Sequence, residues 1–224
     1  MSSTAILVAG HAIVRDLSNY QDDKAWHLLD FQRGEPPKYV EHIRRAVTEA
    51  AADPQSILIF SGGATRRDAG PRSESLSYWL LAEHLQWFGH PEVAQRSYLE
   101  EFARDSFENL LFGICRYREV RGQDPEHVTL VSWAFKQQRF ENLHRQAIGW
   151  PRERFRYIGP NDPEDLSQAQ RAEEKARAQY LADPYSLGPE FQAKKSERNP
   201  FRRQHGYRTS CPEWFSVDKP WHMF

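Results

Sequence analysis

Short runs rich in apolar residues alternate along the chain with longer segments in which apolar residues recur at every third or fourth position. The short runs have the length of strands and cover residues 5–9, 57–60, 96–99, 128–131 and 154–158. The longer segments have helical spacing and cover residues 39–52, 73–88, 105–118, 135–148 and 163–181. This alternation predicts an α/β fold in which a mostly parallel sheet carries helices on both faces.

The pattern changes after residue 182, where prolines and glycines become frequent and prevent long helices. A basic segment covers residues 194–205. Aromatic side chains are scattered through the same stretch, at Phe201, Tyr207, Trp214, Phe215 and Trp221. We therefore expect one domain, residues 1–182, with an irregular basic and aromatic extension, residues 183–224, packed on it.

The strand at 57–60 ends in Ser61-Gly62-Gly63, and Ser73-Glu74 opens the next helix. Glycines at the carboxyl end of a strand let backbone amides approach a ligand, and a helix N-terminus favours a negative charge. Ligands of open α/β sheets bind at this edge. Gly10-His11 ends the first strand at the same edge, so the sequence predicts a binding crevice there.

Four loops are predicted to meet in this crevice: Gly10-His11 and residues 61–66, 100–106 and 132–136. The amides after Gly62 and Gly63, together with Thr65 and Arg66, form the predicted anion cradle. The other candidate ligand-binding residues are Gly10, His11, Ser61, Ser73, Arg104, Asp105, Ser106, Asn109, Ser132, Lys136, Arg139 and His205.

Lys136 and Arg139 are three positions apart, so they are neighbours on one helix face near its N-terminus. Two cations beside a helix N-terminus are unfavourable unless an anion compensates them. This pair, with Arg104, predicts a small anionic partner whose phosphate or carboxylate oxygens accept charge-assisted hydrogen bonds.

Two classes of function fit such a site. The first is a hydrolase or transferase acting on a small phosphorylated or nucleotide-like substrate, with Glu74 or Glu100 as the catalytic general base. The second is a binding module that holds a nucleotide without converting it. No GxSxG or GxGxxG motif is present, which disfavours a serine hydrolase elbow and ordinary dinucleotide binding. A purely structural or partner-binding role is the third reading.

Most of these residues also have structural explanations. The serine-glycine turn can be a tight connection, Ser73 and Asp105 can be helix caps, and Lys136 with Arg139 can be a solvated face. The basic segment, with Arg198, Arg202, Arg203 and His205, can close over the crevice or remain a solvated surface run. These alternatives stay open at this point.

Composition narrows the class of protein. The chain has 224 residues, is 39% hydrophobic and 13% aromatic, and can therefore bury a core. The formal net charge of −1 gives no reason to expect nucleic-acid binding. Two distant cysteines and the lack of an acidic cluster predict no disulfide framework and no metal. No run approaches the about 20 apolar residues of a membrane span, so we expect a cytoplasmic protein without a membrane partner.

The order of the motifs resembles the YdcF-like family over residues 5–144. The resemblance depends on the strand before Gly10, on Ser61-Gly62-Gly63 followed by Ser73-Glu74, on Val131-Ser132 followed by Arg139, and on the spacing in Glu100-x-x-Ala103-x-Asp105-Ser106-x-Glu108-Asn109. It implies a Rossmann-like three-layer α/β sandwich. It also implies S-adenosylmethionine as a cofactor for some relatives and cell-envelope metabolism for others, with no settled reaction.

Two features depart from that family. Lys136 stands where family members commonly have histidine, three residues before the position that Arg139 matches. The N-terminal membrane span of anchored relatives is missing, so an envelope role is not expected. The part of the chain after His144 is similar to a soluble eukaryotic, fungal-like branch.

Overall fold

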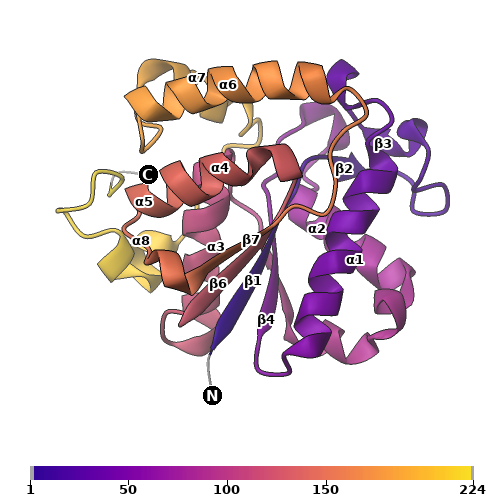
Figure 1. Cartoon of the computed structure of the whole chain (residues 1–224), viewed down its shortest axis with the longest axis horizontal. Coiled ribbons are helices and arrows are strands. Elements are labelled where there is room, and N and C mark those ends of the chain that lie inside the picture. Colours follow the sequence, from indigo (N-terminus) through magenta and orange to yellow (C-terminus); the bar gives the residue numbers. More distant parts are fainter. Residues whose placement is uncertain (1–2, 223–224) are drawn as a thin grey trace.

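The structure is a computed structural model and describes residues 3–222. Its centre is a sheet of five parallel strands in the order β5-β4-β1-β6-β7 (Figure 1). The strands are β1 (Thr4–Ala9), β4 (Ile57–Ser61), β5 (Ser97–Glu100), β6 (His127–Val131) and β7 (Phe155–Ile158). The α/β prediction is thus confirmed, and the molecule is a Rossmann-like sandwich. A two-stranded antiparallel ribbon, β2 (Ile13–Val14) and β3 (Trp26–His27), follows β1.

The two faces of β1 enter two hydrophobic cores. Ile6 and Val8 pack with α1 (Pro36–Ala52) and α2 (Glu74–His84), whereas Leu7 packs with α3 (Ser106–Arg121). All three of these β1 side chains are at most 2% exposed. Because both faces of the strand are covered, nearly every position is apolar, as is typical of a central parallel strand.

Helix α1 begins at Pro36, three residues before the predicted start. Pro36 and Pro37 form its first turn, where proline is favoured because its missing N–H has no partner to lose. Its buried side chains recur at helical spacing, at Tyr39, Ile43, Ala46, Val47 and Ala50. Helix α2 ends at His84, earlier than predicted, and residues 86–88 have positive φ angles.

The helix predicted over residues 135–148 is present in an interrupted form. It starts as a 3-10 turn at Ala134–Lys136, continues as α4 (Gln137–Arg139), widens into a π-turn at Phe140–His144 and ends as α5 (Arg145–Ala147). Single π-turns inside helices are frequent at functional sites. Here the π-turn directly follows Arg139, which lines the cavity described below.

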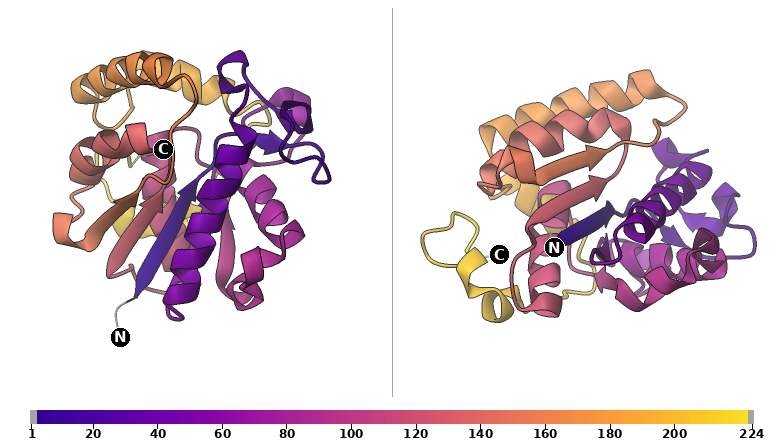
Figure 2. Two further views of the ribbon diagram at one scale, coloured as in Figure 1. Left: turned by 45° about the vertical axis from the view of Figure 1, so that its right-hand side comes forward. Right: turned by 60° about the horizontal axis from the view of Figure 1, so that its bottom comes forward.

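Three helices complete the described chain: α6 (Leu166–Ala182), α7 (Pro189–Glu197) and α8 (Tyr207–Ser210). Figures 1 and 2 show α6 above the end of the sheet toward which the strands run. The extension buries Phe191, Tyr207, Cys211, Phe215 and Trp221 in the core that includes α3. Further 3-10 turns lie at Asp23–Ala25, Asp30–Gln32, Arg67–Ala69, Gln86–Gly89, Pro91–Arg96, Arg152–Arg154 and Pro212–Trp214.

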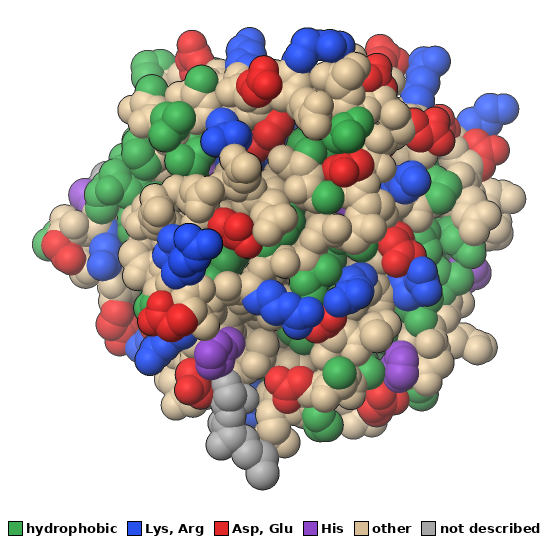
Figure 3. All heavy atoms as spheres, viewed as in Figure 1, with side chains coloured by type: hydrophobic (Ala, Val, Ile, Leu, Met, Phe, Trp, Pro, Cys, Tyr) green, Lys and Arg blue, Asp and Glu red, His purple; other side chains and the backbone are tan. Residues whose placement is uncertain are grey.

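The surface carries charges of both signs. On the face shown in Figure 3, Lys and Arg side chains are interspersed with Asp and Glu side chains. This distribution agrees with the formal net charge of −1. Along residues 3–222, no helix combines the length and the apolar character that crossing a bilayer requires.

Candidate functional site

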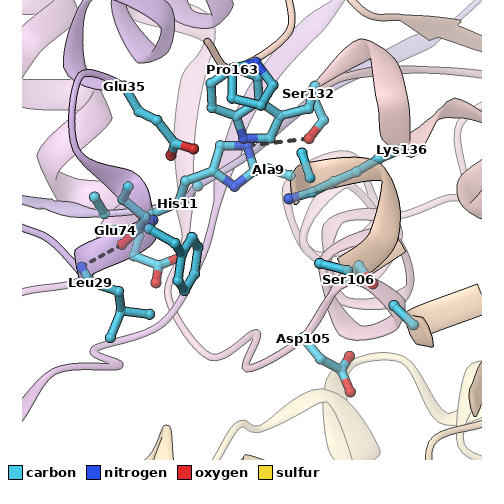
Figure 4. Close-up of a pocket in the computed structure, with 18 of the residues that line it drawn as sticks. Ala9, His11, Leu29, Glu35, Glu74, Asp105, Ser106, Ser132, Lys136 and Pro163 are labelled. Atoms are coloured by element: carbon cyan, nitrogen blue, oxygen red, sulfur yellow. Dashed lines mark hydrogen bonds between the residues drawn. The ribbon is translucent and has the colours of Figure 1, made fainter. Parts of the chain in front are cut away.

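A cavity of about 610 Å³ opens at the carboxyl ends of β1 and β6, and residues of α6 also line it. Figure 4 shows His11, Glu74 and Leu29 on one side of it and Lys136, Ser106 and Asp105 on the other. The structure brings most of the sequence-predicted residues to its wall: Gly10, His11, Thr65, Arg66, Glu74, Arg104, Asp105, Ser106, Asn109, Ser132, Lys136 and Arg139. These residues come from loops that are distant along the chain, because the ends of parallel strands meet at one edge.

His11 forms part of the cavity floor. Its Nε2 lies 3.3 Å from Ser132 Oγ, and its ring stacks on Trp133 at a centroid distance of 5.7 Å (Figure 4). Burial lowers the pKa of His11 well below the usual value of 6.5, and the charge of Lys136 lowers it further. The imidazole is therefore neutral at pH 7 and offers one donor and one acceptor nitrogen.

Glu74 is a buried carboxylate that lines the cavity, 3% exposed. Its Oε1 accepts a hydrogen bond from Thr65 Oγ1 at 2.6 Å and pairs with Arg198 Nη2 at 3.1 Å. A Cβ at Gly10 would lie 2.7 Å from Glu74 Cβ, and one at Gly62 would lie 2.8 Å from Glu74 Oε2. These two glycines are therefore needed to make room for the Glu74 side chain.

The two glycines of the predicted anion cradle do not line the cavity. The N–H of Gly62 donates to the carbonyl of Glu100 at 3.0 Å, and that of Gly63 donates to the carbonyl of Ala103 at 2.8 Å. Both amides are occupied by the last residue of β5 and the loop that follows it, and neither glycine lines the cavity. Ser61 and Ser73 also lie outside the wall; Ser73 Oγ caps α2 by accepting from the N–H of Leu76.

Glu100 does not line the cavity, so the structure does not support it as a general base. Its fully buried carboxyl is bonded to Ser61 Oγ at 2.6 Å and to the N–H of Phe102 at 2.8 Å. Burial raises the pKa of Glu100 to about 7. Ser61 Oγ also lies 2.9 Å from Asn109 Oδ1, so a protonated Glu100 can donate to Ser61 while Ser61 donates to Asn109. The Glu100 carboxyl therefore holds the loop after β5 in place beside the cavity.

Arg104 lines the cavity, but its guanidinium is engaged by Glu108 in a bidentate pair at 2.9 and 2.6 Å. Asp105 caps α3, as predicted, by accepting from the N–H of Glu108 at 2.8 Å. Lys195 of α7 inserts its ammonium between these carboxylates, 3.1 Å from Glu108 Oε1 and 3.5 Å from Asp105 Oδ2. Sequence reasoning missed Lys195, because it lies in a run of charges that looked solvated.

Lys136 and Arg139 differ in their surroundings. Arg139 Nη2 pairs with Glu173 Oε2 of α6 at 3.0 Å, and both side chains are less than 10% exposed. Lys136 Nζ forms no hydrogen bond or ion pair with any of residues 3–222 and lies 5.5 Å from the ring centroid of Phe135. Burial lowers the pKa of Lys136 to about 7, and the charge of Arg139 lowers it further. The cavity thus contains a lysine that has no carboxylate of residues 3–222 in direct ion-pair contact, although the charges of Glu173 and Glu35 act on it from farther away.

The remaining predicted residues have other contacts. Ser106 Oγ lies 2.8 Å from His144 Nε2, and Arg66 Nε lies 3.4 Å from the exposed carboxylate of Asp68. His205 is not in the cavity wall, which corrects its assignment as a ligand-binding residue. It packs in an aromatic cluster with Phe112, at a centroid distance of 4.6 Å.

Several cavity residues were not predicted. Glu35 precedes the first turn of α1 and accepts a hydrogen bond from Tyr39 Oη, and burial raises its pKa. Glu173 comes from α6, whose charged sequence gave no sign that one face covers a cavity. Among residues 3–222, no group of three or more His, Cys, Asp or Glu side chains is placed to hold a metal ion.

Comparison with known proteins finds one described relative. The chain is 28% identical to "Uncharacterized protein YOR238W" of Saccharomyces cerevisiae over an alignment of 259 residues, which covers 90% of this chain and 85% of the yeast protein. No family model matches the chain, and no solved structure matches it. The predicted domain, residues 1–182, makes up only about 81% of the 224-residue chain, which is less than the 90% that the alignment covers. The similarity to the yeast protein therefore extends into the C-terminal extension.

Proposed function

We propose that this is a YdcF-like protein that binds a small anionic, phosphate-containing ligand in the cavity, with the anion against Lys136. The observation that carries the proposal is the ammonium of half-buried Lys136, which lines the cavity and forms no ion pair with a carboxylate of residues 3–222. An unpaired charge that is partly removed from water is unfavourable. A phosphate placed there would offset that penalty and restore the charge of the lysine.

Neighbouring groups suit the same anion. Asn109 lines the cavity and uses its Oδ1 for Ser61, which leaves its amide hydrogens for a ligand. Ser132 and the neutral ring of His11 add a hydroxyl and an imidazole on the floor. Polar donors that converge at one end of a concave site are typical of small-molecule binding.

Glu74 is the group that would make this site catalytic. Thr65 and Arg198 both contact its Oε1, so the carboxylate is held in one orientation inside the cavity. A positioned carboxylate can activate water or an acceptor hydroxyl for hydrolysis or transfer of a phosphoryl group. The alternative is a non-catalytic nucleotide or S-adenosylmethionine site, which the ion pair between Glu74 and Arg198 favours. A cytoplasmic location and the lack of a nucleic-acid partner stay predictions from the sequence.

A thermal-shift panel of inorganic phosphate, sugar phosphates, nucleotides and S-adenosylmethionine tests the proposal. A ligand at 100 times its Kd stabilises the folded protein by about 2.7 kcal/mol. We expect a phosphate-containing ligand to stabilise the protein, and Lys136→Met to abolish the shift. Lys175→Met is the control, because Lys175 is exposed on α6 and does not line the cavity. If the ligand raises the melting temperature of Lys136→Met as much as that of Lys175→Met, the anion does not bind at Lys136.

Turnover is measured in the same samples by following conversion of the ligand that binds. If Glu74 is a general base, Glu74→Gln removes conversion and retains the thermal shift. If the protein is a binding module, neither the wild type nor Glu74→Gln converts the ligand. Loss of the shift in Glu74→Gln would show instead that this carboxylate only maintains the cavity.

A further inference from the structure

An apolar rim lies at the mouth of the polar cavity. Leu29 and Phe31 line the cavity and are nevertheless 40% and 62% exposed. Phe31 is the one aromatic side chain among the large hydrophobic residues exposed on the described chain, the others being Leu29, Leu181, Leu187 and Val217. Leu29 and Phe31 together place exposed apolar surface at the mouth of a cavity, and apolar surface beside a groove is typical of ligand-binding sites.

The rim is held firmly by the residue next to Phe31. Gln32 is 6% exposed, and its Nε2 donates to the backbone carbonyl of His11 at 2.8 Å and to Tyr39 Oη at 3.1 Å. Its Oε1 accepts from the N–H of Leu29 at 2.9 Å. The 3-10 turn is therefore tied to the residue that forms the cavity floor. The position of Phe31 is fixed relative to His11, so its exposure is not that of a loose loop.

Small side chains in another part of the cavity wall leave room for a flat group. Helix α6 lines the cavity with Ala169, Ala172 and Ala176, whose side chains are small. Figure 4 shows Leu29 across the open space from Lys136 and Ser106. The cavity of about 610 Å³ is far larger than a phosphate ion and falls within the range that holds organic ligands of several hundred cubic ångströms.

We propose that the ligand is a phosphate ester carrying a planar aromatic ring, of the nucleoside phosphate class, and that the ring stacks on Phe31 over Leu29 while the phosphate reaches Lys136. This inference rests on the proposed anion site and adds the chemical class of the ligand's other end. Stacking on an aromatic side chain tolerates any base, since every base has a π-face. The rim therefore selects for a ring rather than for a particular base.

The test is a calorimetric titration with three probes: a nucleoside 5′-monophosphate, ribose 5-phosphate and inorganic phosphate. We expect the nucleoside monophosphate to bind at least tenfold more tightly than ribose 5-phosphate. Phe31→Ala should remove that difference without weakening binding of the two probes that lack a ring, and Phe31→Trp should keep it. Leu181→Ala is the control, because Leu181 is 65% exposed and does not line the cavity.

The outcomes separate the two proposals. Equal affinity for the nucleoside phosphate and ribose 5-phosphate, or an equal loss of affinity for all probes in Phe31→Ala, overturns the stacking surface. If binding of inorganic phosphate still depends on Lys136 in that case, the proposed anion site stands and only the stacking of a ring on Phe31 is refuted. Absence of binding by all three probes overturns both proposals.

Discussion

Arg198 Nη2 lies 3.1 Å from Glu74 Oε1, although 124 residues separate the two along the chain. Glu74 begins α2, whereas Arg198 follows α7 in the C-terminal extension. The ion pair therefore connects the extension to the cavity at the end of the sheet. The extension contributes side chains to the candidate site, in addition to covering the core beside α3.

Substituting Arg198 should show how much its ion pair with Glu74 contributes to stability. In Arg198→Ala the buried carboxylate of Glu74 retains Thr65 as its partner and loses its counter-ion, so we expect a loss of about 1–3 kcal/mol in the free energy of unfolding. Urea denaturation measures the change. Arg202→Ala, which alters an exposed arginine of the same segment, should change stability by less than about 0.5 kcal/mol. Equal effects of both substitutions would show that the pair with Glu74 contributes nothing.

Lys195 anchors the same segment. Its ammonium is 1% exposed and is held by the buried carboxylates of Asp105 and Glu108 and by Ser186 Oγ at 2.7 Å. Breaking a buried ion pair by removing one partner costs about 3–5 kcal/mol, so we expect a loss of that size in Lys195→Met. The neighbouring Lys194 is exposed, and Lys194→Met should leave the urea midpoint nearly unchanged. A Lys195→Met protein as stable as the control would refute the anchoring role.

The sheet was predictable from the sequence because its determinants are local. An apolar run such as residues 57–60 specifies a buried strand whatever its neighbours are, and β4 lies there. The helix caps Ser73 and Asp105 were equally predictable, because a capping motif depends on only a few neighbouring residues. The helix predicted over residues 39–52 begins three residues earlier, at Pro36, because proline is tolerated in the first turn of a helix.

The candidate site was less predictable because its partners are distant. Whether the amides of Gly62 and Gly63 are free depends on where the end of β5 and the loop after it lie, and these residues occupy them. The charges of Glu173 and Lys195 look solvated in their own helices, and they become buried only when those helices pack on Arg139 and Glu108. Sequence spacing carries no signal for contacts of this kind.

Glu100 should make stability depend on pH in an unusual direction. Its folded-state pKa of about 7 lies above the ordinary value of 4.5, so the folded protein binds the additional proton between these values. The stabilisation that Glu100 contributes is complete below about pH 4.5 and is lost as the pH rises through 7. The loss amounts to about 3 kcal/mol for a shift of this size. Glu100→Gln imitates the protonated form and should therefore gain about that much relative to wild type between pH 5 and pH 8.

Urea denaturation of both proteins at pH 5 and pH 8 measures this gain. The comparison at each pH cancels the contributions of other titrating groups, such as His42, whose pKa is lowered to about 3 by burial. The hydrogen bonds from the N–H groups of Phe102 and Ala103 can be kept by the amide oxygen of Gln. A stability difference that stays constant from pH 5 to pH 8 would show that Glu100 is ionised throughout.

Lys136 should make ligand affinity depend on pH. Its pKa of about 7 in the free protein must rise when an anion binds, because the anion favours the charged form. Affinity is then nearly constant below pH 7 and falls by up to tenfold per pH unit above it, as a proton must first be taken up. A sulfate-ester analogue of the ligand is the proper probe, since its own charge does not change in this range.

The matched variants separate Lys136 from its neighbours. Arginine stays charged at all relevant pH values, so Lys136→Arg should keep whatever affinity it has constant between pH 6 and pH 9. Glu100→Gln should retain the wild-type fall above pH 7, because Glu100 lies outside the cavity. A fall in affinity that persists in Lys136→Arg and disappears in Glu100→Gln would mean that the titrating group is the buried carboxyl behind Ser61, and the anion would then have to be placed elsewhere.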